Sequence, residues 1–247
     1  YGQLRVNSKG LDLANDSALA QLNQTAQQFA KHQWSAAPMG EHFQTNDAVA
    51  PQSIINPARH TDVVGYVQEA TTEQVEQALN NAQAVQDIWA RTAKDTRASY
   101  LLRAADLMEA RLEELMVLLC RESGKTYANA IAEVREAVDF LRYYATQMID
   151  LDANAEVEPL GTMLCISPWN FPLAIFTGQV AAALVAGNTV IAKPAEQTPL
   201  IAAQAIQILW QAGVPQAAVQ LMPGRGETVG AQLSAADKIQ RVAQQQG

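Results

Sequence analysis

Between residues 162 and 222 the chain alternates short apolar segments with apolar helical segments, and this alternation restricts the possible folds more than any other feature. Glycines follow both helical segments, and the connections are short. Strands and helices that alternate in this way form a parallel sheet covered on both faces, with right-handed crossovers. The sequence therefore predicts an α/β fold. The predicted strands are 162–166, 189–192 and 219–222, and the predicted helices are 173–186 and 199–212.

The first half of the chain predicts a layer of helices that packs against this sheet. Thr71, followed three residues later by Gln74, is a capping-box pattern that begins one helix, and Gly124 is placed to end another. A stretch rich in Ala, Pro, Gln, Asn and Ser suggests an extended arm or linker at 34–57. The predicted helices are 17–31, 71–90, 95–123 and 127–148, with a strand at 62–68 and a last helix starting near 224.

Composition restricts the environment and the partners of the protein. The formal net charge of −8 disfavours nucleic acid and anionic membranes, because phosphate groups repel an acidic surface. No stretch reaches the roughly 18 apolar residues of a membrane-spanning helix. The two cysteines are too few for a disulfide framework, so we expect a reducing, cytoplasmic location. The histidines lack the spacing of metal ligands, and we expect no metal site.

Three loops follow the predicted strands and hold most of the polar residues in this half of the chain. Ligands of an open parallel sheet bind beyond the carboxyl ends of its strands, so these loops are the candidate site. Asn170 lies in the first loop, 167–172, between two prolines. Its side-chain N–H could stabilise a developing oxyanion, and the alternative is that it only satisfies turn backbone.

The second and third loops carry a charged pair and a set of glycines. Lys193 donates and Glu196 accepts hydrogen bonds, so the pair could hold the hydroxyl groups of a cofactor ribose. The alternative is a solvated surface ion pair. Gly224, Gly226 and Gly230 could admit a phosphate or an adenine close to the backbone, and a plain tight turn explains them equally well.

The other reactive or charged side chains carry weaker signals. Cys165 lies within an apolar strand and is expected to be a core residue, and Cys120 has no base beside it. Charged residues of the predicted helices are expected to form ion pairs on helix surfaces, and they are Glu122, Lys125, Glu133, Arg135 and Asp139.

Taken together, the loop sequences resemble the aldehyde dehydrogenase superfamily. The matching blocks are ISPWNFPL at 166–173, GNTV at 187–190 and KPAEQTP at 193–199, in this order and spacing. Further stretches resemble the L-glutamate γ-semialdehyde (Δ1-pyrroline-5-carboxylate) dehydrogenase module of bacterial proline utilization A. They are 7–13, 64–70, 131–140 and 221–232. The resemblance covers nearly the whole chain and implies the Rossmann-like parallel sheet of an NAD-binding domain.

The resemblance implies a role for each matched position. Asn170 is the side-chain half of an oxyanion hole, and Lys193 and Glu196 bind the adenosine ribose of NAD. Glu122 approaches the substrate pocket. The remaining cofactor residues are Ile166, Ser167, Pro168 and Trp169, which line the groove, and Gly226 and Gly230, which lie near the adenine.

The resemblance also implies the reaction of the intact enzyme, in which glutamate γ-semialdehyde, NAD+ and water give glutamate and NADH. The family's pyrophosphate turn, general-base glutamate and nucleophilic cysteine are expected after residue 238, where this sequence differs. We therefore expect a segment of a longer protein, C-terminally truncated, without its catalytic domain and inactive alone. Two alternatives remain open, namely a non-catalytic nucleotide-binding or structural fragment, and a dehydrogenase of another semialdehyde.

The domain organisation follows from the same resemblance. Residues 1–58 are expected to be the arm that follows a proline dehydrogenase domain, and 59–247 an incomplete NAD-binding domain. FAD is expected only in that separate proline dehydrogenase domain. The intact enzyme is expected to be a homo-oligomer that acts on a small-molecule substrate.

Overall fold

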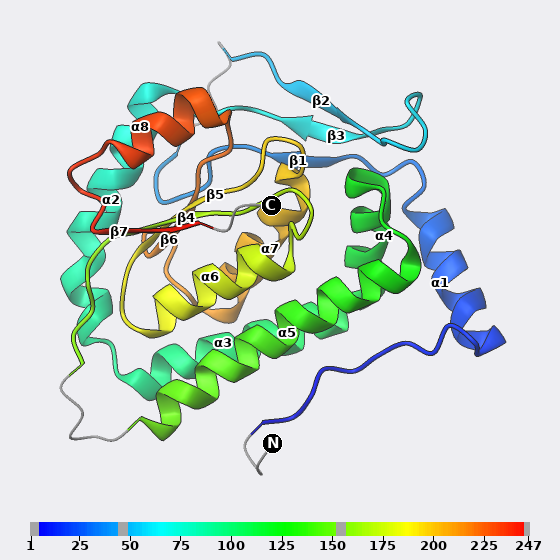
Figure 1. Ribbon diagram of the computed structural model, residues 1–247, viewed down its shortest axis with the longest axis horizontal. Coiled ribbons are helices and arrows are strands. Elements are labelled where there is room, and N and C mark those ends of the chain that lie inside the picture. Colours follow the sequence, from blue (N-terminus) through cyan, green and yellow to red (C-terminus); the bar gives the residue numbers. More distant parts are fainter. Residues whose placement is uncertain (1–4, 44–48, 152–156, 245–247) are drawn as a thin grey trace.

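The computed structural model describes residues 5–43, 49–151 and 157–244. A four-stranded parallel sheet lies at the centre of the fold (Figure 1). The strand order is β6-β5-β4-β7, and all three pairings are parallel. This arrangement confirms the predicted α/β fold. The strands are β4 (Met163–Ile166), β5 (Val190–Lys193), β6 (Val219–Leu221) and β7 (Arg241–Gln244). The sequence analysis missed β7, whose four residues lie at the edge of the sheet and are mostly exposed.

Helices cover both faces of this sheet (Figure 1). Helices α6 (Ala174–Val185) and α7 (Pro199–Ala212) pack on one face, and α2 (Thr72–Arg91) and α8 (Ala231–Ser234) pack on the other. Successive residues of a strand point to opposite faces. In β4, Leu164 therefore joins the apolar cluster of α2 and α8, whereas Cys165 joins the cluster of α6 and α7. Burial on both faces explains why these strands are apolar throughout.

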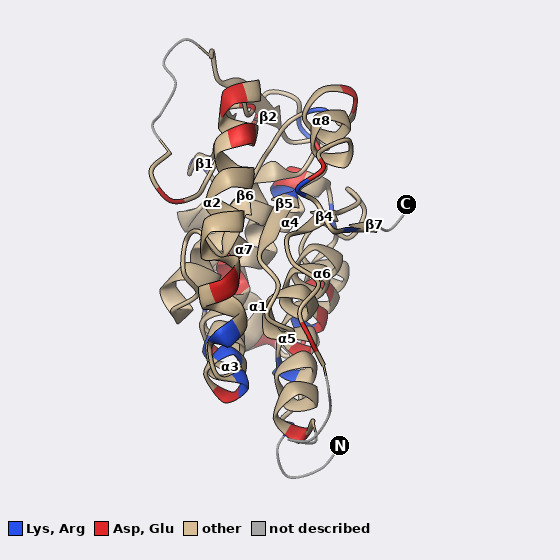
Figure 2. Ribbon diagram, turned by 90° about the vertical axis from the view of Figure 1, so that its left-hand side faces the viewer, with Lys and Arg blue, Asp and Glu red and all other residues tan. Residues whose placement is uncertain are grey.

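The predicted helical layer consists of α3 (Lys94–Ala110), α4 (Leu112–Ser123) and α5 (Tyr127–Asp150), packed against α6 and α7. Figure 2 shows that charged residues lie mainly on the helices and loops around the sheet. The prediction of one helix over 95–123 is wrong, because the chain breaks at Arg111, where φ is −101° and ψ is 17°. The Arg111 side chain bonds both Glu114 and Gln204 of α7, a tertiary contact that local periodicity does not reveal.

A second sheet lies along the stretch that was expected to be an arm or linker, and that expectation is wrong for its two strands. After α1 (Asp16–Gln28), β1 (Trp34–Ala36) pairs in parallel with β3 (Val63–Val67), and β2 (Gln52–Ile55) pairs antiparallel to β3. Strand β2 is largely exposed, so it lacks the apolar alternation that identifies a strand in a sequence. Beyond β1, Met39 and Leu221 of β6 exchange backbone hydrogen bonds of 2.9 and 2.8 Å, which joins the two sheets.

Arg121 at the end of α4 connects this N-terminal region to the helical layer through hydrogen bonds. Its guanidinium bonds both carboxylate oxygens of Asp62, at 3.2 and 2.7 Å, and the carbonyl oxygens of Phe29 and His32. These hydrogen bonds from Arg121 lower the pKa of Asp62 to about 2, against the opposing effect of burial. Within the described ranges, no helix is both long and apolar enough to cross a membrane.

The approach of β1 to β3 generates a prediction about Gly65. A Cβ atom at Gly65 would lie 2.0 Å from the carbonyl oxygen of Trp34, so any side chain must push the two strands apart. We expect Gly65→Ala to lower the free energy of unfolding by about 2 to 4 kcal/mol in urea denaturation. Gly226→Ala is the matched control, because no atom lies within 4 Å of that Cβ position. Equal stability of the two variants would contradict the tight strand contact.

Candidate functional site

The loops that follow β4, β5 and β6 meet at one end of the sheet, because the three strands are parallel neighbours (Figure 1). A groove of about 370 Å³ lies between them. It is lined by Ile166, Ser167, Pro168, Trp169, Lys193, Ala195, Glu196, Gln197, Gly226, Glu227 and Gln244. The loops that the sequence singled out thus form one continuous surface.

This groove brings together most of the residues predicted to bind a cofactor. Gly230 lies just outside it, where its Cβ position would be 3.2 Å from Cε of Lys193, so the lysine stem packs against this glycine. Asn170 follows Trp169 but does not line the groove, and Glu122 lies in the interior. The structure thus gives the positions of Gly230, Asn170 and Glu122, and the roles expected for these residues stay predictions.

Lys193 is the last residue of β5 and is 4% exposed, which rules out a solvated surface ion pair. Burial lowers the pKa of its ammonium group, while the nearby Glu196, Glu69 and Glu227 carboxylates act in the opposite direction. Its Nζ donates to the carbonyl oxygen of Pro194 at 3.1 Å, the one hydrogen bond of this group within the described ranges. A lysine ammonium group has three donors. Lys193 can therefore donate to a ligand as well.

Glu196 supplies acceptor oxygens on the same loop. It is exposed, and its Oε1 accepts a long hydrogen bond of 3.5 Å from the Gln197 side chain. Lys193 and Glu196 thus offer a donor and an acceptor at one side of the groove. This pair of functions fits the neighbouring hydroxyl groups of a ribose.

The third loop enters a helix through two glycines in different surroundings, Gly224 tightly packed and Gly226 open. Gly224 has φ of +156°, and a Cβ atom there would lie 2.4 Å from Cγ2 of Val229. The helix predicted from 224 begins instead as a π-helical turn, η1 (Gly226–Gly230), and continues as the short α8. Open space at the Cβ position of Gly226 lets a planar group approach the backbone there.

Asn170 lies in the loop between β4 and α6, and its side chain does not serve the turn. Its Oδ1 atom is buried and accepts no hydrogen bond from any described residue. The contact of Asn170 is through its backbone oxygen, which accepts a 2.8 Å bond from Nζ of Lys125. A buried amide oxygen without a partner is unusual, so the alternative that Asn170 satisfies turn backbone lacks support.

Glu122 accepts hydrogen bonds at the start of α7. Its two carboxylate oxygens accept from the backbone N–H groups of Leu200 and Ile201, at 2.6 and 2.9 Å. Burial raises the pKa of Glu122 to about 8, although both hydrogen bonds act to lower it. The expected helix-surface ion pair is therefore wrong for this residue. A substrate contact by Glu122 stays a prediction, and capping α7 is the role that its geometry supports.

The expected helix-surface ion pair is also wrong for Lys125 and Glu133. Glu133 is buried between α5 and α6, and the half-buried Lys125 lies beside it and beside the Asn170 loop. Their ammonium and carboxylate groups are 3.1 Å apart, with side chains 13% and 1% exposed. A signal was present in the sequence, because Glu133 shares its helix face with Ala130 and Ala137. A carboxylate within an apolar stripe indicates a buried partner.

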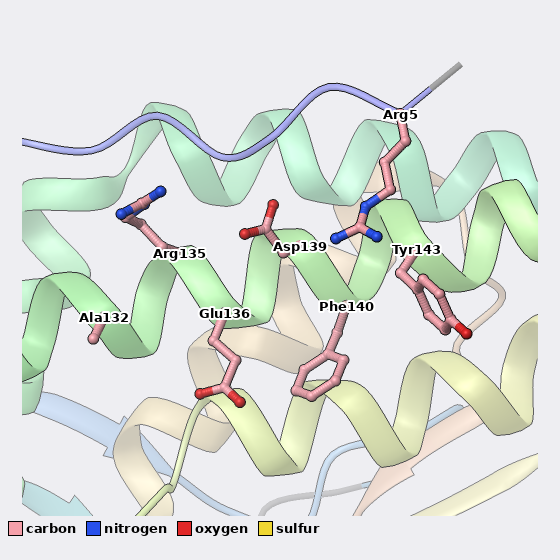
Figure 3. A pocket seen from close by; sticks show the side chains of 7 residues that line it. All are labelled: Arg5, Ala132, Arg135, Glu136, Asp139, Phe140 and Tyr143. Carbon is pink, nitrogen blue, oxygen red and sulfur yellow. The ribbon is translucent and has the colours of Figure 1, made fainter. Parts of the chain in front are cut away.

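A separate hollow of about 510 Å³ lies between the N-terminal segment and α5 (Figure 3). Asp139 accepts hydrogen bonds from the backbone N–H and the hydroxyl of Ser8, at 2.8 and 2.9 Å, and Arg135 donates to the same hydroxyl at 3.3 Å. Arg135 and Asp139 therefore hold the N-terminal segment on α5, which corrects the expected helix-surface ion pairs. The hollow is lined by Arg5, Ala132, Arg135, Glu136, Asp139, Phe140 and Tyr143.

Comparison with known proteins relates this geometry to one family. The model of the aldehyde dehydrogenase family matches residues 43–245. Bifunctional protein PutA of Escherichia coli (strain K12) is 58% identical over 242 residues, which are 98% of this chain and 18% of that protein. Proline utilization A from Bdellovibrio bacteriovorus superimposes with a TM-score of 0.91 at 30% identity, covering 98% of this chain and 27% of the other.

A structure of 1-pyrroline-5-carboxylate dehydrogenase from Thermus with bound NAD superimposes with a TM-score of 0.88 at 30% identity. It covers 96% of this chain and 49% of the Thermus chain. The chain thus spans less than half the length of each of these relatives.

The buried position of Glu122 predicts a pH dependence of stability. Its pKa is about 8 in the folded protein, against about 4.3 in an unfolded chain. Because the folded pKa is raised, the stabilising contribution is complete below the unfolded pKa and is lost as the pH rises through the folded value. We expect the free energy of unfolding of Glu122→Gln to fall less than that of the native protein between about pH 4 and pH 8, measured by urea denaturation.

The control for this prediction is Glu76→Gln, because Glu76 is exposed on α2. That variant should reproduce the pH dependence of the native protein. Identical curves for Glu122→Gln and the native protein would show that Glu122 does not change its protonation on unfolding.

Proposed function

Because the chain belongs to the aldehyde dehydrogenase family, we propose that its groove binds NAD for the oxidation of L-glutamate γ-semialdehyde to L-glutamate. The observation that carries the proposal is the groove itself, where a buried lysine, an exposed glutamate and an open glycine turn lie beside each other. The relatives named bifunctional protein PutA and 1-pyrroline-5-carboxylate dehydrogenase support the choice of substrate, and the Thermus structure with bound NAD supports the cofactor.

The residues of the groove fit the parts of NAD. Lys193 and Glu196 supply a donor and acceptors for the adenosine ribose, and the open Cβ position of Gly226 leaves room for the adenine. Ile166, Ser167, Pro168 and Trp169 form the wall that follows β4, and Gly230 supports the stem of Lys193. When bound, NAD supplies the acceptor for the hydride that leaves the substrate.

Asn170 is the residue of this chain that we assign to the reacting carbonyl group. Its amide N–H would donate to the oxyanion that forms when a nucleophile attacks the aldehyde. Such a donor typically contributes about 2.7 to 4 kcal/mol to transition-state stabilisation. Its side-chain oxygen has no partner in the described part of the chain, so the amide is free of competing contacts within the protein.

The nucleophile is not found among the described residues of this chain. Cys165 is 1% exposed in β4, and burial raises the pKa of its thiol to about 12. Burial likewise raises the pKa of Cys120 to about 11, and neither thiol lines the groove. A thiolate is the nucleophilic form, so both cysteines are unsuited to the attack.

We also propose the wider organisation that the resemblance implies. In it, residues 1–58 connect to a proline dehydrogenase domain that holds FAD, and residues 59–247 belong to the NAD-binding domain of a homo-oligomeric cytoplasmic enzyme. Glu122 stays a predicted substrate residue. These parts of the proposal rest on the likeness to proline utilization A.

The unsuitable thiols predict that the 247-residue protein alone does not oxidise the aldehyde. We expect no NADH absorbance when purified protein is mixed with NAD+ and glutamate γ-semialdehyde. A full-length relative such as bifunctional protein PutA is the positive control. NADH formation by the 247-residue protein, and its loss in Cys120→Ser, would identify Cys120 as a nucleophile and contradict our assignment.

The ribose contacts predict which variants lose NAD. We expect weak binding by the 247-residue protein, visible as saturation transfer from protein to NAD in NMR spectra. Lys193→Met and Glu196→Gln should each reduce this transfer about tenfold, because the first removes the ammonium donor and the second removes the negative charge and one acceptor oxygen. The control is Lys238→Met, since Lys238 lies outside the groove. Equal transfer for all variants would place the binding site elsewhere.

A further inference from the structure

The Asn170 loop is held by one ammonium group at two successive residues. Nζ of Lys125 donates to the backbone oxygen of Asn170 at 2.8 Å and lies 5.0 Å from the centre of the Phe171 ring. Lys125 directly follows Gly124, which ends α4 with φ of 69°. The end of α4 therefore fixes where the Lys125 side chain leaves the backbone, next to the Asn170 loop.

Glu133 holds the other end of the same loop. Its Oε2 accepts from the backbone N–H groups of Leu173 and Ala174, at 3.2 and 3.0 Å, where α6 begins. Its Oε1 lies 3.1 Å from Nζ of Lys125. Lys125 thus contacts the loop at Asn170, Glu133 contacts it at Leu173 and Ala174, and the two side chains contact each other.

Burial makes this chain of contacts stiff. The Glu133 side chain is 1% exposed and the Lys125 side chain 13% exposed, so the pair is largely shielded from water. Separating the two partners of a buried pair would leave each charge uncompensated, which is destabilising. The pair therefore tends to keep its geometry. The loop after β5 differs, because Glu122 caps α7 and the lysine that contacts this loop is its own Lys193, which donates to the carbonyl oxygen of Pro194.

We propose that Lys125 and Glu133 are positioning residues, which together fix the backbone that presents the Asn170 amide. Neither residue touches the groove, so they act on the reacting group only through the loop. The purpose of that positioning rests on the function proposed above, whereas the order of the loop does not. Failure to bind NAD would therefore leave this inference intact.

The test is amide hydrogen exchange, followed by NMR in the 247-residue protein. Lys125→Met removes the charge and the donor while keeping the length of the side chain. The exchange rates at Leu173 and Ala174, whose N–H groups donate to Glu133, should rise about tenfold, because the loop then opens more often. Leu200 and Ile201 serve as internal controls, since Glu122 and not Lys125 caps that helix.

Two further variants separate positioning from general loss of structure. Lys125→Arg keeps the charge and the donors, and should hold the Leu173 and Ala174 amides near their native exchange rates. Glu122→Gln should accelerate exchange at Leu200 and Ile201 only. Should Lys125→Met fail to fold, the double variant Lys125→Met with Glu133→Gln removes both charges together and should still accelerate exchange at Leu173 and Ala174.

The inference is overturned if a folded Lys125→Met protein exchanges its loop amides at native rates. It is also overturned if Lys125→Met accelerates the Leu200 and Ile201 amides to the same extent as the loop, because Lys125 would then support the whole fold. Acceleration confined to the loop, with rescue by arginine, supports the proposal.

Discussion

Two buried carboxylates at the starts of α6 and α7 are the interactions on which the candidate site depends. The first N–H groups of a helix have no partner within that helix, and burying them unpaired is costly. Glu133 accepts two of them at α6, and Glu122 accepts two at α7. Each carboxylate thereby fixes the point at which a strand-end loop turns into a helix.

The groove follows from these two fixed points. The β4 and β5 loops leave neighbouring parallel strands, so capping both helices sets the distance between the two walls of the groove. Lys193 emerges from the end of β5 with its stem against Gly230, and its ammonium group keeps donors for a ligand. The ammonium group that we propose for cofactor binding is therefore placed by packing and not by an ion pair.

The two loops are supported in different ways, and the difference matches their chemistry. The β5 loop contributes exposed groups such as Glu196, which can adjust to a bound ribose. In the proposed function, the β4 loop contributes the Asn170 amide, which would need to point at its target in advance because an oxyanion donor acts through preorganisation. Lys125 adds the extra contact to this loop, at the backbone oxygen of Asn170.

Features that depend on neighbouring residues could be predicted from the amino-acid sequence. The Thr71 capping box and the left-handed turn at Gly124 form as predicted, and the helix that was expected to end at Gly213 does end there, because helix ends are local chemistry. Which charges are buried, and which groups they bind, depends on contacts between distant parts of the chain. Glu133 and its donor Leu173 are 40 residues apart, and Glu122 and its donor Leu200 are 78 apart. Periodicity places such a carboxylate on an apolar helix face, but its partner is chosen by the packing of distant elements.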